Sequence, residues 1–60
     1  MNKEFIQEIL VKSKLSKKDF ASKIDVTIIT LNNWLFGKSE PNFINQKIIR
    51  STFKNEISTK

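Results

Sequence analysis

The fold is decided by residues 17 to 36, which read KKDFASKIDVTIITLNNWLF. Apolar residues recur at helical spacing in each half of this stretch, and Val26 lies between the two groups. The groups are Phe20, Ala21 and Ile24, and then Leu31, Trp34 and Leu35. An apolar stripe of this period is typical of a helix that buries one face. The pattern therefore predicts two short helices that meet at a corner near Val26, which is a helix-turn-helix.

Polar residues mark the ends of both predicted helices. Ser16 can cap the start of the first helix, with Asp19 three residues later as a capping-box variant. Thr27 can cap the second helix, and Gly37 can end it in the left-handed conformation. These signals predict helices over residues 17–24 and 28–36.

The stretch resembles the phage repressor and Cro-like helix-turn-helix family. In that family a hydrophobic residue and an alanine share the first helix, and a turn residue stands between two hydrophobic ones. The second helix adds two hydrophobic residues, and a glycine and a proline follow. The matching positions here are Phe20-Ala21, Ile24-Asp25-Val26, Leu31, Trp34, Gly37 and Pro41. The resemblance covers roughly residues 5 to 53 and implies a lambda-repressor-like domain that binds DNA.

Asp25 departs from the family pattern, which usually has glycine at this turn position with a positive φ. Aspartate tolerates the left-handed region better than most residues, though at some cost in energy. We therefore expect a positive φ and some backbone strain at Asp25.

The segments on either side of the motif also have helical spacing. Residues 3–13 form one predicted helix, and Asn42 can cap another that runs to about Thr52. Their apolar faces are predicted to be Phe5, Ile6, Ile9 and Leu10, then Ile44, Ile48 and Ile49. Residues 54–60 are predicted to form a short helix or a frayed tail. The expected fold is all-α, a single compact domain of four or five helices over residues 1–60, with Phe5, Phe20 and Trp34 in its core.

Composition narrows the class of protein. The chain has no histidine and no cysteine, so we expect no metal site, no cofactor and no enzymatic activity. Its longest apolar runs are three residues, far too short for a membrane span, which predicts a cytoplasmic protein. Sixty residues also leave no room for an effector domain, so we expect no small-molecule effector.

A net charge of +5 favours an anionic partner. Between residues 12 and 38 there are six lysines and two aspartates, so the excess surrounds the motif. A solubilising lysine-rich surface would have the same charge. Because the excess positive charge coincides with the predicted helix-turn-helix, DNA is the favoured partner.

The second helix of such a motif lies in the major groove, where its early and outward residues meet base edges. The candidate base-reading residues are Thr27, Ile28, Ile29, Asn32 and Asn33. Asn33, and after it Asn32, can pair with the N6 and N7 atoms of adenine, while the isoleucines can contact thymine methyls. We therefore expect an A·T-containing half-site. The alternative is that both asparagines only face solvent.

The resemblance implies that Lys17 and Lys38 contact the DNA backbone. Lys18, Ser39 and Asn42 are secondary candidates for phosphate contacts. Backbone N–H groups at the helix N-termini would add to these contacts. Trp34 could in principle stack on a base, but its spacing favours the core.

The sequence thus predicts a sequence-specific regulator of transcription that binds double-stranded DNA. The resemblance implies a small phage or mobile-element repressor that occupies its operator as a homodimer. Ile49, Phe53 and Ile57 exceed what so small a core needs, so the dimer contact is predicted there.

A second function stays open, because Ile28, Ile29 and Phe36 would give the second helix an unusually apolar outer face. Such a face could bind a protein. The chain would then be an antirepressor, an antitoxin-like module or an excision accessory factor.

Overall fold

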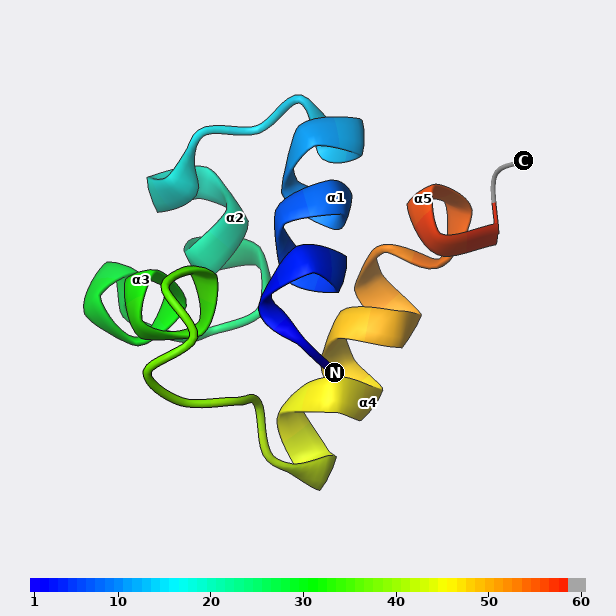
Figure 1. Ribbon diagram of the computed structural model, residues 1–60. Helices are drawn as coiled ribbons and strands as arrows, with labels where there is room; N and C mark the ends of the chain where they lie inside the picture. The colour runs from blue at the N-terminus through cyan, green and yellow to red at the C-terminus, as the bar shows by residue number, and fades with distance from the viewer. Residues whose placement is uncertain (59–60) are drawn as a thin grey trace.

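The computed structural model describes residues 1–58, and this part of the chain is all-helical (Figure 1). Its helices are α1 (Lys3–Ser13), α2 (Lys17–Lys23), α3 (Ile28–Leu35), α4 (Phe43–Thr52) and α5 (Lys54–Ser58). The predicted helix pair is confirmed to within one residue at each end. The segment predicted as a short helix or a tail is the helix α5, and residues 59 and 60 lie outside the described part.

The first four helices all begin with a side-chain cap. Ser16 Oγ accepts from the Asp19 N–H at 3.1 Å, and Thr27 Oγ1 accepts from the Thr30 N–H at 3.1 Å. Asn42 Oδ1 accepts from the Asn45 N–H at 2.8 Å. Each cap satisfies a backbone donor that has no partner within the helix. All three predicted caps are confirmed, and Asn2, which caps α1 in the same way through the Phe5 N–H, is an additional one.

The corner of the helix-turn-helix is built on the positive φ of Asp25, which is 60°. The Asp25 N–H donates to the Ser22 carbonyl at 3.2 Å, and the Val26 N–H donates to the Ala21 carbonyl at 3.0 Å. This pair of bonds is a Schellman motif, which closes a helix and turns the chain away from it. The predicted positive φ is confirmed.

Helix α3 ends in the same way. Gly37 has a φ of 78°, and its N–H donates to the Trp34 carbonyl at 3.2 Å. The Lys38 N–H donates to the Asn33 carbonyl at 2.9 Å. Glycine suits this site because it adopts a positive φ without steric cost.

Helix α1 ends differently, at Lys14, with a φ of 61°. The Ser13 hydroxyl accepts from the Leu15 N–H at 3.2 Å and donates to the Leu10 carbonyl at 2.7 Å. The hydroxyl therefore bridges two backbone groups that a Schellman motif would join directly.

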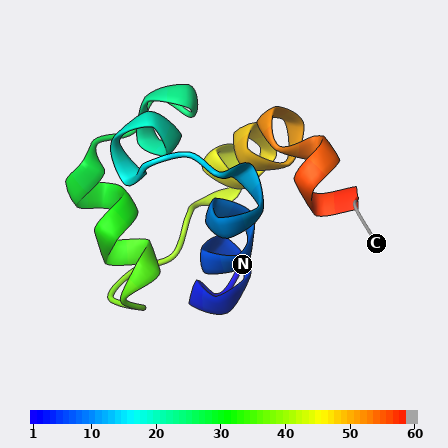
Figure 2. The ribbon, with the colours of Figure 1, turned by 90° about the horizontal axis from the view of Figure 1, so that it is seen from above.

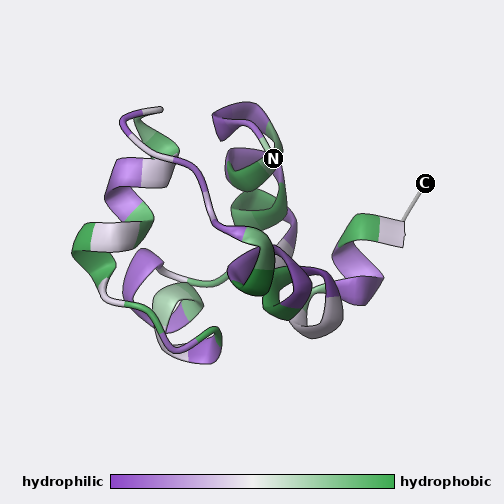
Figure 3. Ribbon diagram, turned by 90° about the horizontal axis from the view of Figure 1, so that it is seen from below, coloured by the Kyte–Doolittle hydropathy of each residue, from purple (hydrophilic) through white to green (hydrophobic). Residues whose placement is uncertain are grey.

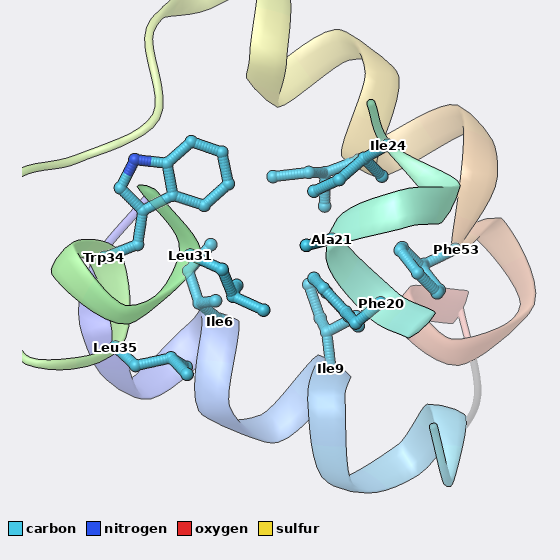
Figure 4. Packing of buried hydrophobic residues seen from close by; sticks show 10 residues of the cluster. Ile6, Ile9, Phe20, Ala21, Ile24, Leu31, Trp34, Leu35 and Phe53 are labelled. Atoms are coloured by element: carbon cyan, nitrogen blue, oxygen red, sulfur yellow. The ribbon is translucent and has the colours of Figure 1, made fainter. Parts of the chain in front are cut away.

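Ten apolar residues form one core at the meeting of α1, α2, α3 and α4 (Figure 4). They are Ile6, Ile9, Phe20, Ala21, Ile24, Leu31, Trp34, Leu35, Ile49 and Phe53. The rings of Phe20 and Phe53 stack with centroids 4.3 Å apart and an interplanar angle of 7°. Burial of Phe20 and Trp34 confirms two of the three predicted core aromatics.

Three predictions about apolar residues need correction. Phe5 is only half-buried at the edge of the core, with the Arg50 guanidinium 5.8 Å from its ring centroid. Ile44 is exposed, because only one side of α4 is covered by the other helices. Ile49 and Phe53 are buried within the subunit, so they are not surplus to its core and cannot offer a surface to a second copy. Ile57 is half-buried against the core.

The strain at Asp25 can be measured. We expect Asp25→Gly to raise the free energy of unfolding by about 0.5 kcal/mol, because relief of the left-handed penalty exceeds the extra unfolded-state entropy of glycine. Asp25→Ala, the matched control, should lower it by a similar amount. Thermal unfolding followed by circular dichroism would measure both. A clear loss of stability in Asp25→Gly would mean that the carboxylate makes a needed local bond.

Phe53 provides a second test, because it distinguishes a core residue from an interface residue. We expect Phe53→Ala to cost about 3–5 kcal/mol, enough to unfold most of so small a domain. Ile57→Ala, on the neighbouring helix, should cost clearly less because Ile57 is only half-buried. Unfolding at low protein concentration, where no dimer forms, is the measurement. If Phe53→Ala were as stable as the wild type under those conditions, Phe53 would be an interface residue and not a core residue.

Candidate nucleic-acid interface

Helix α3 lies along one edge of the molecule, with one side against the core and the other open (Figure 2). Leu31, Trp34 and Leu35 are buried on its inner side, and α1 and α2 pack against it. The Gln7 side-chain amide also donates to the Leu35 carbonyl at 2.9 Å, which ties the end of α3 to α1. The inner side of α3 is thus fixed against the core. Its outer side carries Ile28, Ile29, Asn33 and Phe36, and we call these residues the ridge.

Three of the five predicted base-reading residues lie on or beside this open side. Ile29 is 70% exposed and Ile28 is 43% exposed. Asn33 is half-buried, and it follows Leu31, a residue of the buried inner side, by two positions in the helix. At about 100° per residue, Ile29 and Asn33 both point away from Leu31, so the two side chains lie on one outward face.

Asn32 is placed differently from the prediction. Its Oδ1 atom is buried and has no hydrogen-bond partner in the described structure. An acceptor that is hidden from solvent is also hidden from the edge of a base. Asn32 is therefore unsuited to the bidentate pairing with adenine in this conformation, because that pairing needs its carbonyl oxygen.

Thr27 stands at the exposed start of α3, as predicted, but its hydroxyl is already engaged. It caps the helix, and it lies 3.0 Å from the hydroxyl of Thr30. The two hydroxyls share one hydrogen bond, so they form a small polar pair at the leading end of the helix.

A contact between Lys17 and Phe36 links the first helix of the motif to the end of the second. The Lys17 ammonium lies 5.8 Å from the centroid of the Phe36 ring, within the range of a cation–π interaction. Phe36 is 64% exposed, and this contact gives its ring a neighbour that periodicity alone did not reveal. The contact places the positive charge of Lys17 beside the C-terminal end of α3.

The other predicted phosphate-contacting residues occupy the same end of α3 or the start of a helix. Lys38 and Ser39 follow Gly37 in the exposed loop, and Lys18 is the exposed second residue of α2. Asn42 is exposed at the start of α4, with its side-chain oxygen used for capping. Two lysines from different segments, Lys17 and Lys38, thus lie at the C-terminal end of α3.

A hollow between α1 and α4 offers a contrast. It is lined by Met1, Asn2, Glu4, Phe5, Glu8 and Arg50. Its two glutamates are matched by Arg50 and the terminal amine of Met1, so the hollow lacks the excess positive charge that attracts the phosphate groups of a nucleic acid. The described residues contain no cluster of three or more side chains able to hold a metal ion. None of their helices is long and apolar enough to cross a bilayer.

Comparison with protein families identifies a family model, described as Helix-turn-helix, which matches residues 6–54. No curated protein and no solved structure matches the chain at a significant level. The matched range runs from within α1 to the start of α5 and includes all of α3 together with Lys17 and Lys38. The all-helical arrangement agrees with the lambda-repressor-like fold of that family. The chain therefore belongs to the Cro and C1-type helix-turn-helix family of DNA-binding regulators.

Proposed function

We propose that this chain is a sequence-specific repressor, of the kind used by phages and mobile elements, that occupies an operator as a homodimer. One observation supports this most directly. The outer side of α3 is open along the edge of the molecule (Figure 2), and Lys17 from α2 and Lys38 from the loop after α3 lie at its C-terminal end. A helix in that setting fits the major groove, with cations at the adjoining phosphates.

The proposed base contacts come from the outward residues of α3. Asn33 can offer its amide to the N6 and N7 atoms of adenine, and Ile29 and Ile28 can pack on thymine methyls. Thr27 adds its polar group at the leading end. No arginine lies on this helix to read guanine, so we expect a half-site that contains A·T pairs.

The proposed phosphate contacts come from Lys17 and Lys38, with Lys18, Ser39 and Asn42 in support. Side chains at the N-termini of α2 and α4 are well placed for this role, because the helix dipoles there also attract phosphate. The net charge of +5 would speed the encounter with DNA of any sequence.

A second candidate function is protein binding through the ridge. The exposure of Ile29 and Phe36 on α3 favours it, since a base-reading helix gains little from a large exposed aromatic ring. The slope of affinity for duplex DNA against salt distinguishes the two functions. Binding through phosphates releases counterions and gives a steep slope, which a protein interface does not require.

Asn33→Ala tests base reading. The variant should bind the preferred site about 1–3 kcal/mol more weakly and lose much less on random duplex, with little change in salt slope. Asn32→Ala is the matched control on the same helix, and it should keep wild-type discrimination because its oxygen is already buried. Fluorescence anisotropy on a site obtained by selection from random duplexes provides the measurement. If Asn33→Ala loses the same affinity on the preferred site and on random duplex, Asn33 does not read bases.

Lys17→Ala and Lys38→Ala test the phosphate contacts. Each should weaken binding about equally on preferred and random DNA, and each should lessen the salt slope by roughly one. Lys54→Ala, on α5, removes the same charge from an exposed position outside the ridge and serves as the control. If Lys54→Ala lowers the slope as much as the other two do, the lysines act only through net charge.

A further inference from the structure

Helix α3 carries no charged side chain, although a helix with one side open to solvent usually carries several. Its eight residues read IITLNNWL, and three of them, Leu31, Trp34 and Leu35, are buried. Ile29 is 70% exposed and Ile28 is 43% exposed, so the first turn presents two aliphatic side chains. Figure 3, coloured by hydropathy, shows this turn in green at the left edge of the molecule. The leading end of α3 is therefore an apolar surface.

Few hydrogen-bonding groups remain near this leading end to read the edge of a base. The Oδ1 atom of Asn32 is buried. The hydroxyl of Thr30 lies 3.0 Å from that of Thr27, and the two share one hydrogen bond. Asn33 is only half-buried, but it lies a full turn further along the helix than Ile29. The first turn of α3 thus meets a ligand mainly through aliphatic carbon.

The C5-methyl group of a pyrimidine is the apolar group that the major groove offers to such a surface. Thymine carries this group, and unmodified cytosine does not. 5-Methylcytosine has a methyl group at the same ring position as thymine. The two methylated bases differ at C4, where thymine has an acceptor oxygen and cytosine has a donor amino group. Isoleucine has neither a donor nor an acceptor in its side chain, so it cannot distinguish these C4 groups.

We infer that this chain recognises 5-methylcytosine in duplex DNA, because Ile28 and Ile29 bind C5-methyl groups whichever pyrimidine carries them. The inference rests on the proposed function, in which α3 lies in the major groove. It goes beyond that function, because the affinity for one base sequence then depends on whether its cytosines are methylated.

The two isoleucines are held in place before any ligand arrives. The Thr30 N–H donates to the Thr27 hydroxyl at 3.1 Å, and the Leu31 N–H donates to the Thr27 carbonyl at 3.1 Å. These bonds fix the first turn of α3, and the buried Leu31 fastens it to the core. Isoleucine in a helix also has one strongly preferred χ1 rotamer. Little side-chain entropy is therefore lost when a methyl group packs against this turn.

The charges around α3 favour the major groove, and not an apolar protein surface, as what covers the isoleucines. Lys17 lies beside Phe36 at the C-terminal end of the helix, and Lys38 follows in the exposed loop. An apolar protein surface would leave both ammonium groups without anionic partners. In duplex DNA the C5-methyl groups lie in a groove bordered by phosphates. One ligand therefore meets the apolar turn and the lysines together.

The size of the effect follows from the area of one methyl group. Burial of a group of this size changes affinity by about four-fold, which corresponds to about 0.8 kcal/mol. Two methyl groups, one against each isoleucine, would change it by about sixteen-fold. Methylation of one or two cytosines in a half-site would therefore alter the occupancy of that site at a fixed protein concentration.

Two matched pairs of duplexes isolate the methyl group. In the first pair, uracil replaces one thymine of a site obtained by selection from random duplexes. In the second pair, cytosine and 5-methylcytosine are compared at the same position. Neither comparison changes a donor or an acceptor of the base. We expect at least one position of the half-site at which the methylated base binds about four-fold more tightly in both pairs, measured by fluorescence anisotropy. If 5-methylcytosine gives no gain over cytosine at any position, the inference is wrong.

Variants of the protein assign the effect to the isoleucines. Ile28→Ser and Ile29→Ser each shorten an exposed side chain, so each should reduce the gain from the methyl group at one position from about four-fold to nearly none. Val11→Ser is the matched control, because Val11 is a 74% exposed aliphatic residue on α1, and it should keep the full gain. Circular dichroism establishes that each variant is folded. A gain that persists in both isoleucine variants would mean that the methyl group acts through the shape of the DNA, which contradicts the inference.

The inference and the proposed function can fail separately. If the chain binds duplex DNA with a salt-dependent slope but gains nothing from a methyl group at any position, the inference fails and the DNA-binding role stands. If the chain binds no duplex with a salt-dependent slope, the proposed function fails and the inference fails with it.

Discussion

The structure depends on the close packing of α3 across α2, which the small side chain of Ala21 permits. Ala21 is 2% exposed and lies on the side of α2 that faces Leu31 and Trp34 (Figure 4), so a bulkier side chain at this position would hold α3 away from the core. Burial of Leu31 and Trp34 is worth roughly 1.5–3 kcal/mol for each side chain, a large share of the net stability of a small domain. Everything on the outer side of α3 is positioned by what lies on its inner side.

Backbone chemistry at the two helix ends makes this packing possible. The Schellman motifs at Asp25 and Gly37 fix the directions in which the chain leaves α2 and α3. The first sets the corner between the helices, and the second sends the chain toward α4. Side-chain caps then restart the helices at Thr27 and Asn42. Two independent signals thus specify the motif: the spacing of its apolar residues, and the capping residues at the ends of its helices.

Local signals made much of this fold predictable from the sequence. The caps at Ser16, Thr27 and Asn42 and the positive φ of Asp25 depend on neighbours a few residues away, so the sequence alone could indicate them. Ile44 and Ile49 share the same helix and the same chemistry, but only the way α4 packs against the rest of the core decides which of them is covered. The contact between Lys17 and Phe36 and the buried oxygen of Asn32 also depend on tertiary structure, which periodicity does not describe. The assignment of base readers was therefore coarser than the assignment of helices.

The stacked rings of Phe20 and Phe53 have a consequence for how the protein comes into being. One ring belongs to the first helix of the motif, and the other is added thirty-three residues later in synthesis. At about 5–20 residues per second, the ribosome takes seconds to supply that second ring, far longer than a short helix needs to form. During this interval α2 and α3 can form and dissolve repeatedly without a complete core. The nascent chain therefore stays without a stable DNA-binding surface until Phe53 has been made.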